Sequence, residues 1–558
     1  MRTRYAPAHA RRILCVYPRY ARSFGTFQHA YGFFGGRVRA FMPPQGLLVV
    51  AAYLPESWTV RFVDENSQAA TPEDFQWADA VFVSGMHIQR PQIHDVVARA
   101  HRHGRAIVVG GPSVSGCPEY YPDADFIHVG ELGDATDRLI EQLDRDPGRP
   151  THQLRFETVE RLPLASFPTP AYEMIQLREY FIANMQFSSG CPYSCEFCDI
   201  PALYGRNPRL KTAAQVLAEL DLIAAAGATS VYFVDDNFIG NQKAALELLP
   251  HLVEWQTRHR YPLRFACEAT LNIAKNERVL ELMREAGFIT IFCGIETPEP
   301  DALHAMSKDQ NLRMPILDSV KRINSYGLEV VSGIILGLDT DGPDTADHII
   351  EFIRASSIPV LTINILYALP KTPLWTRLEA EGRLVNDEGR ESNVEFKLPY
   401  ETVQAMWRRC ITAAYAPEAV YERFAYNITH TFSRRKKYPM NSQRASWENV
   451  RMGFGILGRL IWRVGVLSDY RRTFWRLAWP ALKKGDIEPL IHTAIVSYHL
   501  IAFTRDCLEG VGESSFYAPT TTVPSIEVGG PDMAPPTPHI PPTPHTLVTP
   551  RHSQSAPR

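Results

Sequence analysis

Long apolar runs are absent from this sequence. No window of about 18 uncharged apolar residues occurs, so we expect no helix that spans a bilayer. The basic start, residues 1–12, is not followed by a signal-peptide core, because the apolar run Ile13–Val16 has only the length of a strand. These absences predict a cytoplasmic protein.

An excess of charge of one sign is also lacking. Lys and Arg total 58 and Asp and Glu total 61, so the net charge of −3 gives no reason to expect a nucleic-acid partner. Apolar residues make up 45% and charged residues 21%, which excludes wholesale disorder and a fibrous repeat. Nine cysteines in 558 residues are too few for a disulfide framework. At about 100–200 residues per domain, the length predicts about three domains.

Short apolar runs alternate with helical patterns over residues 10–145. This alternation predicts an α/β domain of the doubly wound, Rossmann-like kind, with helices on both faces of a parallel sheet. Such sheets bind ligands beyond the carboxyl ends of their strands, where glycines let the backbone approach a large ligand. Three expected strand ends carry residues suited to this: Ser84–His87, Gly110–Ser113 and Gly130–Gly133. Each loop alone also fits a tight turn. A dinucleotide site is disfavoured because the first turn region, Tyr17–Gly36, lacks Gly-x-Gly-x-x-Gly.

A second α/β unit is expected over residues 181–385, after a proline-rich linker at 146–180. Six repeats of strand and helix predict a partial (β/α)6 barrel, with its chemistry at the carboxyl ends of the strands. Thr212 is the expected N-cap of one helix, and Gly227 is expected to end it. The candidate strands are Met185–Ser188, Ser230–Val234, Arg264–Cys267, Ile289–Ile295, Glu329–Leu336 and Leu361–Leu366.

Residues 386–510 are expected to form a mostly helical domain that is basic and rich in tryptophan. Between residues 430 and 486, 13 Lys and Arg stand against three Asp and Glu, and four of the nine tryptophans lie there. Two interpretations are open: a cap that packs its aromatic side chains on the barrel, or a surface that contacts a membrane. Residues 511–558 hold 11 of the 43 prolines and are expected to be disordered.

Three cysteines, Cys191, Cys195 and Cys198, lie at C-x3-C-x2-C spacing directly after an expected strand. Soft thiolates at this density are typical ligands of an iron–sulfur cluster. In a [4Fe–4S] cubane, three cysteines leave one iron open to a small molecule. A structural zinc site would require a fourth ligand and usually pairs two C-x2-C halves. The remaining alternative is that the three cysteines are core residues that bind nothing.

The loop resembles the cluster motif of the radical S-adenosylmethionine (SAM) superfamily, C-x3-C-x-aromatic-C, with Phe197 as the aromatic. The resemblance implies a [4Fe–4S] cluster whose open iron binds SAM and whose reduction yields a 5′-deoxyadenosyl radical. It also implies SAM contacts at strand ends, although the usual Gly-Gly-Glu is replaced by Val234–Asn237. The implied contacts are Asp235 and Asp236 for the amino group, Glu268 and Glu296 for the ribose, and Ser332 in the adenine-binding strand. Each carboxylate also fits an ordinary helix cap or ion pair.

A doubly wound domain before such a barrel resembles the cobalamin-binding domains of this superfamily. Residues 1–145 lack Asp-x-His-x-x-Gly, so the resemblance is to the subset without a protein ligand below cobalt. His87 could face the corrin, or it could cap and pack within the fold. The implied cobalamin contacts are Met86, His87, Gly110, Gly111, Ser113, Gly130 and Glu131.

Further runs over residues 10–510 resemble the hopanoid C-2 methylases. The runs are Phe41–Gly46, Ser84–Arg90, Tyr232–Phe238, Ala269–Ala274, Ala368–Leu374 and Val464–Glu488. This resemblance implies transfer of a methyl group from methylcobalamin to C-2 of the hopanoid A ring, with two SAM molecules used per turnover. It implies a hopanoid lipid substrate, an electron donor of the flavodoxin or ferredoxin type, and peripheral contact with the inner face of the cytoplasmic membrane.

Three other functions are open at this point. The first is cobalamin-dependent radical SAM methylation or cyclisation of another lipid or secondary metabolite. The second is methylthiotransfer to tRNA or protein, which would want a second cluster where the N-terminal domain offers only Cys15 and Cys117. The third is a cobalamin sensor or an electron carrier, and neither needs a three-cysteine cluster with an open iron.

Overall fold

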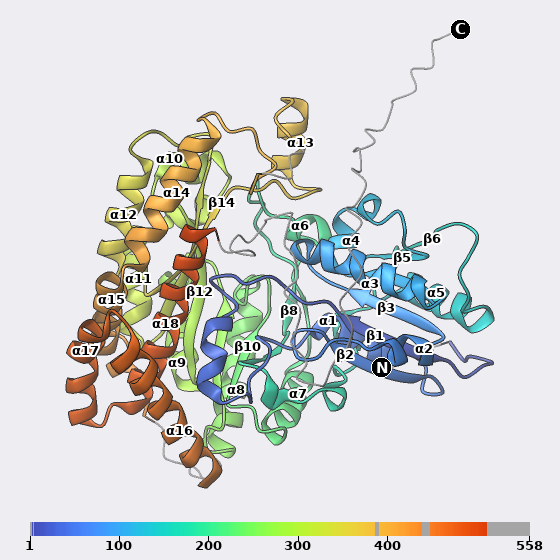
Figure 1. The fold of residues 1–558 in the computed structure, drawn as a ribbon, viewed down its shortest axis with the longest axis horizontal. Helices are drawn as coiled ribbons and strands as arrows, with labels where there is room; N and C mark the ends of the chain where they lie inside the picture. The colour runs from blue at the N-terminus through green and yellow to red at the C-terminus, as the bar shows by residue number, and fades with distance from the viewer. Residues whose placement is uncertain (1–2, 4, 386–389, 438–446, 511–558) are drawn as a thin grey trace. The chain divides into compact units, whose positions relative to one another are not determined.

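Two parallel six-stranded sheets organise the part of the chain that the computed structural model describes, residues 3, 5–385, 390–437 and 447–510 (Figure 1). The first sheet has the strand order β2-β1-β3-β4-β5-β6, and every neighbouring pair is parallel. Its strands are β1 (Arg12–Tyr17), β2 (Thr59–Asp64), β3 (Ala80–Ser84), β4 (Ala106–Gly110), β5 (Phe126–Val129) and β6 (Leu154–Glu157). The connecting helices are α1 (Gln45–Tyr53), α2 (Pro72–Trp77), α3 (Arg90–Arg102), α4 (Pro112–Gly116) and α5 (Asp134–Arg145).

Helices cover both faces of the first sheet. Successive side chains of a strand point to opposite faces, so each buried strand places apolar residues on both. In β1, Ile13 and Cys15 belong to a buried cluster that includes residues of α1 and α5. Leu14 and Val16 belong to a second buried cluster that includes residues of α2 and α3. The predicted doubly wound domain is therefore confirmed.

The sixth strand, β6, lies within the segment 146–180 that the sequence predicts as a linker. It pairs in parallel with β5, with Phe126 opposite Leu154. Its side chains alternate between half-buried and exposed. The strand lies at the edge of the sheet and has one neighbouring strand only. A strand of four residues with two exposed side chains has too little apolar pattern to be predicted from the sequence. The rest of the segment forms three short 3-10 turns, η4 (Leu164–Ser166), η5 (Tyr172–Met174) and η6 (Leu177–Glu179).

The second sheet has the order β14-β13-β12-β11-β10-β7, again with parallel neighbours throughout. Six strands in chain order form the expected partial barrel. The strands are β7 (Ala183–Met185), β10 (Ser230–Phe233), β11 (Arg264–Glu268), β12 (Phe288–Glu296), β13 (Glu329–Leu336) and β14 (Val360–Ile365). The helices and 3-10 turns are α6 (Ile200–Leu203), α7 (Ala213–Ala225), α8 (Gln242–Arg258), η7 (Leu271–Lys275), α9 (Glu277–Ala286), α10 (Pro300–Ala305), η8 (Asp309–Arg313), α11 (Ile316–Ser325), α12 (Thr345–Ser356) and α13 (Pro373–Ala380).

Helix α7 has the ends that the sequence predicts. The Thr212 hydroxyl accepts a hydrogen bond from the Gln215 amide, and the Gln215 side chain bonds back to Thr212, which makes a capping box. Gly227 follows the helix with a φ of +82°, a left-handed conformation that favours glycine.

The first barrel strand differs from the prediction of a single strand, Met185–Ser188. The chain forms β7 up to Met185 and then a separate strand β8 (Ser188–Ser189), which pairs antiparallel with β9 (Arg209–Leu210). The break arises because the Phe187 amide donates to the Asp235 carboxylate, 2.7 Å away, and not to a neighbouring strand. The chain therefore leaves the sheet just before the cysteine loop.

Helices form the rest of the described chain, as predicted, and α14 packs on β14 and α12 (Figure 1). The Trp407 indole donates to the Ile363 backbone oxygen at 2.8 Å, so this packing includes a buried hydrogen bond. No described helix is long and apolar enough to cross a membrane. The expected disordered tail, 511–558, lies outside the described residues. The elements are α14 (Tyr400–Tyr415), α15 (Pro417–His430), η9 (Phe432–Arg434), α16 (Trp447–Leu460), the π-helical η10 (Ile461–Leu467), α17 (Arg471–Lys484) and α18 (Ile487–Glu509).

Candidate functional site

The cysteine loop begins at Gly190, directly after β8. Gly190 has a φ of +100°, and a Cβ atom added there would lie 2.8 Å from the Gly205 oxygen, so this position requires glycine. The Cys191 amide donates to the same Gly205 oxygen at 3.2 Å. Cys195 is buried, whereas Cys191 and Cys198 are partly exposed. The loop is thus held against the segment after α6 with two of its thiols accessible.

Amide groups donate to two of the three sulfurs. Gln310 Nε2 lies 3.3 Å from Cys195 Sγ, and Asn237 Nδ2 lies 3.9 Å from Cys191 Sγ. Burial raises the pKa of the Cys191 and Cys198 thiols, and the neighbouring cysteines raise it further. Three thiolates repel one another unless a cationic group binds them. Amide donors commonly surround the sulfurs of iron–sulfur clusters, so this donor set fits such a cluster.

The three thiols do not gather around one point. In the described residues, no group of three His, Cys, Asp or Glu side chains could hold a single metal ion. A cubane cluster binds each cysteine through a different iron atom, so it suits thiols spread along a loop.

Glu296 ends β12 in a strained conformation and forms a buried ion pair. Its φ is +69°, which is uncommon for a residue with a long side chain. Lys308 Nζ lies 2.5 Å from Glu296 Oε1, and both side chains are at most 10% exposed. Burial opposes the charge of Lys308, but Glu296 and the nearby cysteines hold the pKa of the lysine above its ordinary value. The strained Glu296 is therefore fixed by a cation that also faces the cysteine loop.

Lys308 and Gln310 are functional candidates that the sequence did not reveal. Lys308 Nζ lies 5.3 Å from the centre of the Phe197 ring, the aromatic residue of the cysteine motif. Gln310, two residues later, donates to Cys195. The two side chains thus connect the cysteine loop to the end of β12. Their only sequence signal is a polar run after α10, which is typical of any surface loop.

Three acidic side chains gather at the ends of β10 and β11. Burial raises the pKa of Asp235 to about 7, that of Asp236 to about 6 and that of Glu268 to about 7, and nearby acidic side chains add to each effect. Asp236 Oδ2 accepts from the Gly190 amide at 2.6 Å, so this cluster borders the cysteine loop. Groups with such shifted pKa values are typical of functional sites.

Asp235 and Ser332, which are predicted to contact SAM, form hydrogen bonds that hold the backbone in place. The Asp235 carboxylate accepts from the Phe187 amide and the Ser188 hydroxyl, at 2.7 and 2.8 Å, and it is 1% exposed. The Ser332 hydroxyl is fully buried and donates to the Cys293 oxygen at 2.7 Å. Asp235 therefore shapes the chain before the cysteine loop, and Ser332 joins two strands. Glu268 and Glu296 are the last residues of β11 and β12, and Asp236 follows the end of β10.

His87 lies where loops of the two sheets meet. Its ring is 5.5 Å from that of Tyr120 and 6.0 Å from that of Tyr367, which follows β14. Burial, with a smaller effect of the Arg90 charge, lowers the pKa of His87 to about 3, so the ring is neutral near pH 7. Met86, beside it, is 48% exposed.

Glycines at two strand ends of the first sheet are required by the backbone. Gly111 has a φ of +92°, and a Cβ atom there would collide with Ser84 Oγ. Gly130 has a φ of +97° and donates its amide to Ser115 Oγ at 2.9 Å. The Ser113 hydroxyl is buried and bonded to the Tyr121 hydroxyl at 2.5 Å. Gly110 lies at the end of β4 beside Gly111. These loops are tight turns, as the simpler interpretation predicts, and they leave backbone exposed at the sheet edge.

Glu131 connects the two sheets. Its carboxylate lies 2.5 Å from Arg209 and 3.3 Å from Arg161, and the Ser189 hydroxyl is 3.4 Å away. Ser189 and Arg209 belong to the antiparallel β8–β9 hairpin, whose two strands flank the cysteine loop in the chain. From the barrel side, Lys371 Nζ donates to the Ser115 oxygen at 2.5 Å. The carboxyl-end loops of the two sheets are therefore in direct contact.

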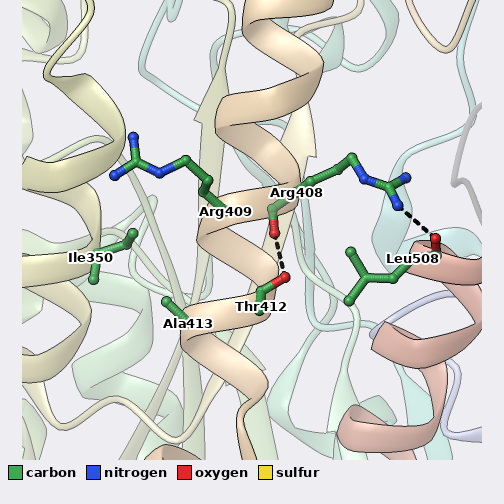
Figure 2. Close-up of a pocket in the computed structure, with 6 residues that line it drawn as sticks. All are labelled: Ile350, Arg408, Arg409, Thr412, Ala413 and Leu508. Carbon is green, nitrogen blue, oxygen red and sulfur yellow. Dashed lines mark hydrogen bonds between the residues drawn. The ribbon is translucent and has the colours of Figure 1, made fainter.

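A hollow on the helical part of the chain is separate from this site (Figure 2). Its two arginines have partners, because Arg408 donates to the Leu508 oxygen and Arg409 pairs with Asp347, each at 2.6 Å. It is lined by Ile350, Arg408, Arg409, Thr412, Ala413 and Leu508.

Family models match three consecutive parts of the chain. Residues 33–140 match the B12 binding domain, and residues 185–353 match the radical SAM superfamily. Residues 372–513 match a domain of unknown function, DUF4070. The first match includes β2 to β5 of the first sheet, and the second includes β10 to β13 of the second sheet.

Curated relatives match the chain over most of its length. A hopanoid C-2 methylase of Rhodopseudomonas palustris (strain TIE-1) is 58% identical over 91% of this chain and 96% of its own length. An uncharacterized methyltransferase of Synechocystis sp. is 33% identical over 90% and 94%. A hopanoid C-3 methylase of Methylococcus capsulatus is 25% identical over 37% of this chain and 40% of its own.

Two solved structures share the fold. The cobalamin-dependent SAM radical enzyme OxsB has a TM-score of 0.56 at 15% identity and covers 90% of this chain and 81% of its own. The radical SAM methyltransferase TsrM from Kitasatospora setae has a TM-score of 0.54 at 16% identity and covers 68% and 79%.

We predict that Gln310→Leu makes the reduction potential of the cluster more negative. Reduction adds negative charge, and an amide donor at Cys195 stabilises that charge, so losing a hydrogen bond of about 1 kcal/mol corresponds to roughly 40 mV for one electron. An EPR-monitored redox titration measures the shift. The exposed Gln76→Leu is the matched control. An unchanged potential in Gln310→Leu would show that this contact does not tune the cluster.

We predict that Glu131→Gln loosens the β8–β9 hairpin and leaves cobalamin affinity unchanged. The substitution leaves the partly buried Arg209 guanidinium without its anion, at a cost of about 1–3 kcal/mol. Hydrogen exchange of the hairpin and the melting temperature measure the effect, with the exposed Glu141→Gln as control. Weaker cobalamin binding with normal exchange would instead make Glu131 the cobalamin contact that the sequence predicts.

The comparisons and the geometry agree. The donor set of the cysteine loop fits a cluster, the matched models each include the central strands of one parallel sheet, and a curated relative is similar along nearly its entire length. A [4Fe–4S] cluster, SAM and cobalamin are the cofactors of this protein, and it is a radical SAM C-methyltransferase. The chain belongs to the hopanoid C-2 methylase family of cobalamin-dependent radical SAM enzymes.

Proposed function

We propose that this enzyme methylates C-2 of the A ring of a hopanoid. The observation that carries the proposal is the extent of the 58% identity, which spans 96% of the hopanoid C-2 methylase and includes the helical C-terminal part. A match limited to the cofactor domains would support the chemistry without the substrate. The hopanoid C-3 methylase, by contrast, matches only 37% of the chain.

Residues of the second sheet would hold the cluster and SAM, and residues of the first sheet would hold cobalamin. The bound cofactors supply a strong hydrogen-abstracting radical and a transferable methyl group. We propose that Cys191, Cys195 and Cys198 hold the cluster. The acidic residues Asp236 and Glu268 would face the amino and ribose groups of SAM. Both carboxyls have raised pKa values, so a cationic amino group arriving beside them would favour their ionised form.

Glu296 would be a preorganised acceptor for SAM hydroxyl groups. Lys308 fixes the position of its carboxylate, and the strained backbone aims it across the strand ends. Asp235 and Ser332 would act indirectly, because their own hydrogen bonds hold the loop and the strands in place. We therefore assign them positioning roles in the proposed SAM site.

Contacts between the two sheets would keep water from the reacting groups. His87 packs between aromatic residues of both sheets, and Glu131 and Lys371 add polar links on either side. A neutral His87 can lie against a corrin face without a desolvated charge. Met86, Gly110, Gly111, Ser113 and Gly130 would form the rest of the proposed cobalamin surface, mainly through their backbone.

The proposed reaction needs two further partners. Reduction of the cluster requires an external one-electron donor, and we propose a flavodoxin or ferredoxin. A pentacyclic lipid resides in a bilayer, so we propose that the enzyme works at the inner face of the cytoplasmic membrane through its helical C-terminal part.

Anaerobic turnover tests the proposed function. We expect protein reconstituted with iron, sulfide and hydroxocobalamin to convert diploptene to a lipid one methyl group heavier when SAM and a strong reductant are supplied. Mass spectrometry follows the lipid and 5′-deoxyadenosine. Cys195→Ala should lose both products and its cluster absorbance, because one of three thiolate ligands is removed.

The control is Cys410→Ala, which removes a buried thiol on α14 away from the cysteine loop and should retain both products. Formation of 5′-deoxyadenosine with unchanged lipid would contradict the hopanoid substrate and favour another lipid or secondary metabolite. Loss of both products in Cys410→Ala would mean that the cysteine variants report on folding only.

A further inference from the structure

Helix α16 and the π-helical turn η10 are apolar on two opposite faces. Ile456, Leu460 and Val464 recur every fourth residue and are buried against the rest of the chain. Phe454, at 71% exposure, and Trp462, at 60%, are offset from them by two residues and point to solvent. Two residues correspond to about 200° around a helix, so the second face is turned away from the core.

The outward face is a continuous stripe. It consists of Trp447, Val450, Phe454, Trp462 and Val466, which we call the outer stripe, and each is at least 37% exposed. Neighbouring members are three or four residues apart, except for the eight residues between Phe454 and Trp462, where Gly458 adds no side chain, so all five lie along one side of the helix. Single exposed apolar residues are normal on a protein surface, but a contiguous row marks an interaction site.

Unpaired cations follow the outer stripe along the chain. Arg472, Arg476, Lys483 and Lys484 of α17 are exposed, and no carboxylate of the described residues pairs with them. The acidic Asp469, between the two helices, is already paired with Arg505 at 2.8 Å. Exposed positive side chains therefore follow the outer stripe on α17.

Not every cation of the region belongs to this surface. Arg459 donates to the Phe33 oxygen at 2.9 Å, and Arg463 lies over the Phe33 ring at 5.6 Å. Both side chains pack on glycines of the segment that contains η1 (Gln28–Phe34). They anchor α16 to the N-terminal part of the chain and so fix which face of the helix stays outside. Trp475 is likewise used internally, because its indole donates to the Gly465 oxygen at 2.8 Å.

We propose that the outer stripe is the surface through which this protein docks on an anionic lipid bilayer, with α16 and η10 lying in the plane of the interface. Tryptophan and phenylalanine favour the boundary between headgroups and acyl chains. The cations of α17 add attraction to anionic headgroups. No described helix is long and apolar enough to span a membrane, so the contact is peripheral. The purpose of this docking, access to a lipid substrate, rests on the proposed function. The docking itself requires no substrate.

Vesicle binding of the full-length holoenzyme tests this proposal. The probe is phosphatidylcholine vesicles with and without phosphatidylglycerol, and co-sedimentation measures the bound fraction. We expect binding to the anionic vesicles, and we expect Phe454→Ala with Trp462→Ala to weaken it roughly tenfold or more, because both side chains leave the interface. Arg472→Gln with Arg476→Gln should weaken binding to the anionic vesicles roughly fivefold per residue and reduce its dependence on salt.

The matched control is Leu222→Ala on α7, an apolar residue 51% exposed and far along the chain, which should bind as the wild type does. Brominated lipids should quench tryptophan emission, and the triple variant Trp447→Phe, Trp462→Phe, Trp479→Phe should lose that quenching while its vesicle binding persists. This readout depends on depth in the lipid and does not depend on the assay of activity.

Three results would overturn the proposal. One is wild-type protein that remains free of anionic vesicles at low salt. Another is a Phe454→Ala, Trp462→Ala variant that melts like the wild type and still binds fully. The last is light scattering that shows a wild-type dimer which the same variant dissociates, because the outer stripe would then be covered by a second copy. Vesicle binding without methylation of diploptene would leave the docking surface intact and contradict only the proposed substrate.

Discussion

The parallel direction of every strand in the two large sheets decides where this protein can do chemistry. Parallel pairing places all carboxyl ends of a sheet on one edge, and the loops that follow them must share that edge. The cysteine loop, the Asp236 and Glu268 carboxylates and the strained end of β12 meet there for this reason. The glycine-rich loops of the first sheet share an edge in the same way. Contacts of Glu131, His87 and Lys371 then bring the two edges against each other.

The candidate site has more acidic groups than cations when its cofactors are not bound. The thiols of Cys191 and Cys198 and the carboxyl groups of Asp235, Asp236 and Glu268 lie near one another, and burial, together with neighbouring acidic groups, raises their pKa values. Lys308 is the buried cation that the cysteine loop and Glu296 share. A cationic cluster and the amino group of SAM would supply the missing positive charge. The binding of these cofactors and the ionisation of the site are therefore coupled by ordinary electrostatics.

The helical C-terminal part has to satisfy two requirements with one sequence. Its inner faces pack on the rest of the chain, as the Trp407 hydrogen bond to β14 and the buried row on α16 show. Its outer face keeps apolar side chains in water, which costs free energy unless a second apolar phase covers them. A lipid surface is such a phase, and it is also where a hopanoid would be found.

Local patterns in the sequence were enough to predict most of the architecture. The strands Ala80–Ser84 and Glu329–Leu336 are β-branched runs between turn residues, and Thr212 and Gly227 mark a helix through their own backbone preferences. The spacing of three cysteines predicts a cluster loop because the motif is contiguous. The tertiary structure alone decided what depends on distant partners: the Lys308–Glu296 ion pair, the Gln310 contact with Cys195, and the use of Glu131 as a link between sheets. It also decided which tryptophans are buried and which are exposed, since one helix can present apolar residues on both faces and only packing determines which face meets water.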